Sequence, residues 1–111
     1  MLDKKTFCHA IEEIKRVEDA RDKLQSINSD FCFGTFQYDL QDELINVLAK
    51  SMNLQESELT GNTISWWIYD TKFGKDSPLV TIKENNKSKT YNLNTVEKLY
   101  YFCKQESKIG R

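Results

Sequence analysis

The residues that could carry catalysis are few, and their spacing assembles no recognised reaction centre. His9 is the only histidine, and it directly follows Cys8. A cysteine nucleophile needs a histidine base that converges on the same substrate, with a third group to orient the base. Neighbouring positions on a helix point about 100° apart, so Cys8 and His9 diverge. The pair therefore does not predict a cysteine protease or a related enzyme.

Metal and cofactor sites are not predicted either. Cys8, Cys32 and Cys103 are far apart, no CxxC pair occurs, and one histidine is too few for the usual zinc sites. The many carboxylates lack the spacing and glycine of a calcium loop, and no glycine-rich phosphate or nucleophile motif is present. We expect no catalytic residues, no metal and no cofactor, so the protein is predicted not to be an enzyme. The cysteines are expected to be free thiols in a reducing cytosol.

Aromatic residues in "ISWWIYD" (64–70) predict a binding surface instead. If this run is a strand, Trp66 and Trp67 point to opposite faces. The face with Ile64, Trp66 and Ile68 is the more continuously apolar, which leaves Trp67 and Tyr69 on the outer face. Tryptophan and tyrosine supply much of the binding energy at protein interfaces. The predicted partner-binding residues are Trp67, Tyr69, Lys72 and Phe73, unless segment 31–38 of the same chain covers them.

Lysines near these aromatics allow a second interpretation. Lys83, Lys87 and Lys89 follow in the same half of the chain, and basic groups beside aromatics on a sheet suit single-stranded nucleic acid. However, 16 basic and 17 acidic residues give a formal charge of −1, which argues against a large phosphate-binding surface. Nucleic-acid binding is therefore the alternative to protein binding.

The elements that must position these residues follow from periodicity. Apolar stripes at helical spacing cover residues 2–28 and 39–53, and residues 94–107 begin with the N-x-x-E spacing of a capping box. Aromatic and β-branched residues dominate 63–73, 79–84 and 89–93, with turn residues between them, while 31–39 reads as a strand or a packed connector. We predict one α+β domain over residues 1–111. It has two N-terminal helices, a three-stranded antiparallel meander and a C-terminal helix packed on one sheet face.

Composition is ordinary for a soluble domain. Hydrophobic residues make up 39% of the chain and charged residues 30%. No apolar run approaches the roughly 18 residues of a membrane helix, and the N-terminus has no signal-peptide core. We expect a cytoplasmic protein with no membrane contact, and an outer aromatic face would also suit a homodimer.

The C-terminal half resembles short uncharacterised proteins of Gram-positive phages and prophages. These have a helical N-terminal half, an "ISWWIY" strand and a closing helix of the form L-x-T-x-E-x-L-Y-x-F. The matching positions here are Ile64, Ser65, Trp66, Trp67, Ile68, Tyr69, Leu93, Thr95, Glu97, Leu99, Tyr100 and Phe102. The motif looks structural rather than catalytic and transfers no active site. The resemblance implies a small accessory protein that binds a host or defence protein and blocks it, as anti-CRISPR proteins do.

Overall fold

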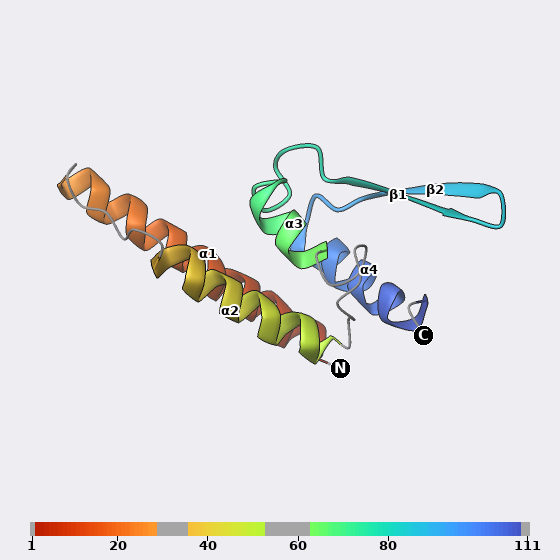
Figure 1. Cartoon of the computed structure of the whole chain (residues 1–111), viewed down its shortest axis with the longest axis horizontal. Coiled ribbons are helices and arrows are strands. Elements are labelled where there is room, and N and C mark those ends of the chain that lie inside the picture. Colours follow the sequence, from red (N-terminus) through yellow and green to blue (C-terminus); the bar gives the residue numbers. More distant parts are fainter. Residues whose placement is uncertain (1, 29–35, 53–62, 110–111) are drawn as a thin grey trace.

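The computed structural model describes residues 2–28, 36–52 and 63–109. These form an α+β arrangement of four helices and a two-stranded antiparallel sheet (Figure 1). Of the predicted strand or connector at 31–39, residues 31–35 lie outside the described residues, as do Cys32 and the predicted turn at 61–62, and residues 36–39 form the start of a helix (Phe36–Ser51). None of the described helices is both long and apolar enough to cross a membrane.

Helices α1 (Lys4–Ile27) and α2 (Phe36–Ser51) lie side by side and antiparallel (Figure 1). Asp3 caps α1, because its Oδ1 accepts a hydrogen bond of 2.8 Å from the Thr6 N–H. The buried Gln41 side chain donates to the Ile14 carbonyl over 3.2 Å. The bond from Gln41 to Ile14 joins the two helices and places Gln41 on the face of α2 that meets α1.

The segment "TISWWIY" is helix α3 (Thr63–Tyr69) and not a strand. Ile64, Trp67 and Ile68 are buried together, which is the i, i+3, i+4 pattern of a helix. The expectation that Trp67 lies on an outer sheet face is therefore wrong, because its side chain is only 1% exposed. Its Nε1–H donates a 2.7 Å hydrogen bond to the Leu93 carbonyl. Trp67 is thus a core residue that ties α3 to the entrance of the last helix.

Strands β1 (Leu79–Glu84) and β2 (Lys87–Asn92) form a hairpin that projects beyond the helices (Figure 1). Helix α4 (Val96–Ile109) follows and contacts the hairpin, where the Tyr91 and Phe102 rings meet edge to face at 5.2 Å. The core lies where the four helices converge. It is formed by side chains of every helix, with Phe7, Ile11, Leu48, Met52, Ile64, Trp67, Leu99 and Cys103 among the most buried.

The predicted architecture of two helices followed by a three-stranded meander is wrong. Three helices precede the sheet, and only β1 and β2 pair among the described residues. The reason is that residues 63–69 of the expected first strand (63–73) form α3 and bury a helical stripe against the other helices. Without them the sheet has two strands, and most of its surface is exposed.

Candidate protein-binding groove

A groove of about 760 Å³ runs between α1, the start of α2, and α3 with the turn that follows it. We call it the tyrosine groove. Aromatic, acidic and basic side chains line it, together with Gln41 and Ile68. The aromatic residues are Tyr38, Tyr69 and Phe73; the acidic residues are Glu18, Asp19, Asp22 and Asp42; the basic residues are Lys15, Lys72 and Lys75.

Two tyrosines from different helices meet in the groove. The rings of Tyr38 on α2 and Tyr69 at the end of α3 lie 6.2 Å apart between centroids. Tyr69 is half-buried, and its hydroxyl donates a 2.8 Å hydrogen bond to Asp42 Oδ1. Burial and then this bond raise the pKa of Tyr69 well above its usual range, so the phenol stays neutral. Tyr38 is 48% exposed, which makes it more exposed than Tyr69 and Phe73, the other two aromatic residues of the groove.

The turn after α3 shapes the other wall of the groove. Lys72, Phe73 and Gly74 all have positive φ, at 49°, 59° and 86°. The Thr71 hydroxyl bonds the Trp67 carbonyl and accepts a 3.0 Å hydrogen bond from the Gly74 N–H, which holds the turn in place. Non-glycine residues in this left-handed region carry a cost of order 1–2 kcal/mol each. Such strain often accompanies functional surfaces, and here it presents the Phe73 ring and the Lys72 ammonium beside Tyr69.

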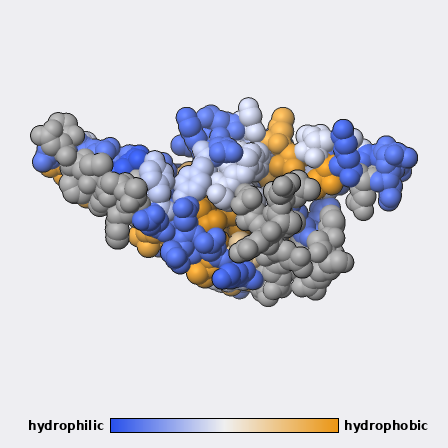
Figure 2. Space-filling view, in the orientation of Figure 1, coloured by the Kyte–Doolittle hydropathy of each residue, from blue (hydrophilic) through white to orange (hydrophobic). Residues whose placement is uncertain are grey.

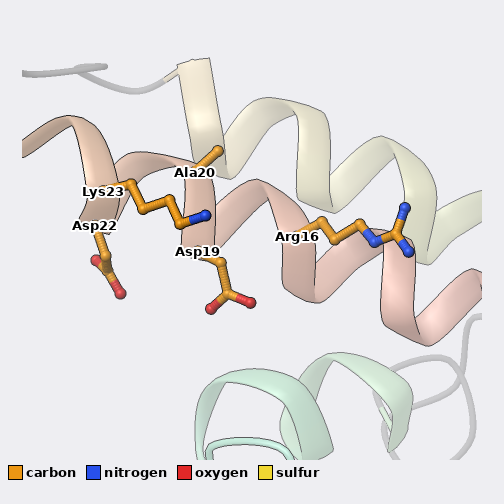
Figure 3. Close-up of a pocket in the computed structure, with 5 residues that line it drawn as sticks. All are labelled: Arg16, Asp19, Ala20, Asp22 and Lys23. Atoms are coloured by element: carbon orange, nitrogen blue, oxygen red, sulfur yellow. The ribbon is translucent and has the colours of Figure 1, made fainter.

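Charged side chains of both signs line the groove. The Lys15 ammonium lies over the Phe73 ring at 5.9 Å, and Lys72 pairs with Asp76 at 3.4 Å on the exposed turn. Helix α1 also contributes the carboxylates of Glu18, Asp19 and Asp22, of which Asp22 pairs with Arg21 at 2.8 Å. Figure 3 shows Asp19 and Asp22 pointing from α1 toward the side where α3 lies; both also line a neighbouring shallow pocket. The groove thus combines three aromatic rings with acidic side chains from α1 and α2 and with basic side chains from α1 and from the turn after α3.

Three of the four predicted partner-binding residues lie in this groove. Tyr69, Lys72 and Phe73 are brought together there, whereas Trp67 is buried behind them against Phe73, with ring centroids 6.0 Å apart. Sequence reasoning missed Tyr38. The signal was the spacing of Tyr38, Gln41 and Asp42, which places all three on one face of α2.

The predicted basic residues do not share a face. Lys83 lies opposite Ser88 on one face of the hairpin, and Lys89 lies opposite Ile82 on the other. Lys87 and Lys89 line a second groove, of about 610 Å³, with Tyr91 and Gln105. The Lys89 ammonium sits 5.0 Å from the Tyr91 ring centroid. Two lysines, not three, are therefore available to one ligand there.

A buried carboxyl group lies apart from both grooves. Glu106 on α4 is 6% exposed, and the Thr63 hydroxyl contacts its two oxygens at 2.9 and 3.2 Å. Burial raises the pKa of Glu106 to about 7, and the Thr63 hydrogen bond opposes this. Burial also raises the pKa values of the Cys8 and Cys103 thiols. Neither of these two cysteines is an activated nucleophile.

Comparisons with known proteins do not assign this chain to a family. No protein family, curated protein or solved structure matches this chain. Among the described residues, no group of three or more histidine, cysteine or acidic side chains is arranged to hold a metal ion.

Proposed function

We propose that this protein acts by binding another protein stoichiometrically through the tyrosine groove. The observation that carries the proposal is the convergence of Tyr38, Tyr69 and Phe73 from separate segments into one open groove. Tyrosines fixed by neighbouring contacts offer a large contact area at low entropic cost, which is typical of energetic centres of interfaces. Tyr69 is fixed in this way by its hydrogen bond to Asp42.

The charges of the groove define the chemistry of the partner. A complementary segment carries an apolar or aromatic side chain that packs on the groove's aromatic rings, and a basic group that faces Glu18 and Asp19 of α1. An acidic group would face Lys72 and Lys75. Such complementary charges set orientation and association rate more than affinity.

Inhibition of a host or defence protein is the version of this function that we favour. Its support is the resemblance of the C-terminal half to small phage proteins. The proposal places the protein in the cytoplasm, where the free Cys8 and Cys103 thiols are stable.

A matched pair of tyrosine variants tests the proposal. Tyr38 is 48% exposed and Tyr101, on α4, is 54% exposed, so Tyr38→Ala and Tyr101→Ala remove similar surface from different places. In captures from a Gram-positive lysate, a discrete protein retained by wild type and Tyr101→Ala but lost with Tyr38→Ala supports the proposal. Equal retention by both variants would contradict it.

Nucleic-acid binding stays the second candidate, because Lys87, Lys89 and Tyr91 line the groove beside the hairpin. It predicts recovery that nuclease abolishes, affinity that falls steeply with salt, and sensitivity to Lys89→Ala rather than Tyr38→Ala. A protein interface in the tyrosine groove should weaken much less with salt.

A further inference from the structure

The hairpin has two open edges, and its turn determines which backbone groups they present. Asn85 and Asn86 both have positive φ, at 50° and 63°, the conformation of a two-residue type I′ turn. In such a hairpin the two residues that flank the turn, Glu84 and Lys87, exchange backbone hydrogen bonds with each other. Moving away from the turn, backbone hydrogen-bonded pairs then alternate with pairs that are not hydrogen-bonded. Thr81 opposite Thr90 is therefore a non-bonded pair. The N–H and C=O groups of both threonines point outward, one set at each edge.

The two edges differ in charge. Strand β2 carries Lys87 and Lys89, and lysines on an edge strand hinder pairing with another strand. Strand β1 carries one lysine, Lys83, followed by Glu84, and has no charged residue from Leu79 to Ile82; Leu79 is 56% exposed. In Figure 2, apolar surface lies near the base of the hairpin and hydrophilic surface covers its tip. The β1 edge is thus less protected against pairing than the β2 edge, which has two lysines.

We propose that β1 pairs with β1 of a second copy of this chain to form a symmetric four-stranded antiparallel sheet. The β1 sequence is complementary to itself in this arrangement. Pairing centred on Thr81 places Val80 beside Ile82 of the second copy on one face. On the other face Leu79 meets the aliphatic stem of Lys83 of the second copy, and no like charges are opposed. The Thr81 and Thr90 hydroxyls already contact each other at 3.0 Å, and the second copy extends this row of threonines.

The dimer is expected to be weak and to leave the tyrosine groove open. Two six-residue strands bury less area than the roughly 1,600 Å² of a standard interface, so the dimer should dissociate on dilution in the micromolar range. The hairpin projects on the side of the molecule away from most of α1 and α2 (Figure 1). Each copy would then present its own groove, and the dimer stands independently of the proposed function.

Two proline variants test this proposal. Thr81→Pro and Thr90→Pro each remove one outward N–H and the same threonine–threonine contact, but at opposite edges. Because of the two-fold symmetry, Thr81→Pro removes two hydrogen bonds between copies and should weaken the dimer at least about tenfold.

Sedimentation velocity over a range of concentrations gives the readout. We expect wild type and Thr90→Pro to approach twice the 13.0 kDa of one chain, and Thr81→Pro to stay at that mass. Wild type that stays monomeric at millimolar concentration, or equal dissociation of both variants, would overturn the proposal. Amide exchange in wild type decides the case if Thr81→Pro fails to fold. The Thr81 and Lys83 amides should gain protection with concentration, and the Thr90 amide should not; protection confined to Thr90 would also overturn it.

Discussion

Trp67→Ala should unfold or severely destabilise this protein, although the sequence pattern favoured a surface role for this residue. The side chain is 1% exposed, and its Nε1–H is bonded to the buried Leu93 carbonyl at 2.7 Å. Truncating a buried tryptophan costs about 3–5 kcal/mol, and leaving a buried carbonyl without its donor adds about 1–3 kcal/mol. Domains of this size have a free energy of unfolding of roughly 5–15 kcal/mol, so the loss is a large fraction of the total.

Two further variants separate the contributions at this position. Trp67→Phe keeps much of the ring volume but loses the hydrogen bond, and should cost about 1–3 kcal/mol. Trp66→Ala is the matched control, because Trp66 is the adjacent tryptophan of α3 and is only partly buried. Urea unfolding followed by far-UV circular dichroism measures all three. The reasoning fails if Trp67→Ala lowers the free energy of unfolding no more than Trp66→Ala does.

The remaining predictions concern the turn, the groove and the buried carboxyl. Gly74→Ala should cost about 2 kcal/mol in thermal unfolding, because φ is +86° and the added methyl would meet the Leu93 carbonyl and Trp67 at 3.1 Å; an unchanged midpoint would contradict this. Tyr69→Phe removes the bond to Asp42 and should cost about 1 kcal/mol of stability while weakening partner binding, and unchanged affinity would exclude a role for the hydroxyl. The pKa of Glu106 is raised from 4.5 to about 7, so the folded state keeps a proton that the unfolded chain releases. Stability should therefore fall as pH rises from about 4.5 to about 7, by roughly 3 kcal/mol. Glu106→Gln should flatten this dependence in urea titrations at several pH values, and an unaltered profile would assign it to other groups.

Helices with long apolar stripes could be predicted from the sequence, and the short aromatic segment could not. Over a run as short as "ISWWIYD", the strand and helix periods both leave plausible apolar faces, and aromatic and β-branched residues favour a strand. The helix is stabilised by contacts distant in sequence, such as the bond from Trp67 to Leu93. Local propensity cannot show such contacts, so the meander was predicted with one strand too many.

The part of the candidate site whose residues are close together in the sequence could be predicted, and the part assembled by helix packing could not. Tyr69, Lys72 and Phe73 are near neighbours in the chain, and the structure places all three in the tyrosine groove. Tyr38 and Asp42 come from α2, and only the packing of α2 near α3 brings them to Tyr69. The three lysines of the alternative nucleic-acid site do not lie on one face, because the register of the hairpin places Lys83 on the face opposite to Lys89.

Site-specific photo-crosslinking tests the central claim, that the tyrosine groove is the partner-binding surface, most directly. A photoreactive phenylalanine analogue replaces Tyr38 in one variant and Tyr101 in the other, two positions of similar exposure on different helices. Irradiation in a Gram-positive lysate should yield a discrete protein adduct from position 38 and none from position 101. An adduct from position 101 alone, or identical adducts from both positions, would contradict the assignment of the groove.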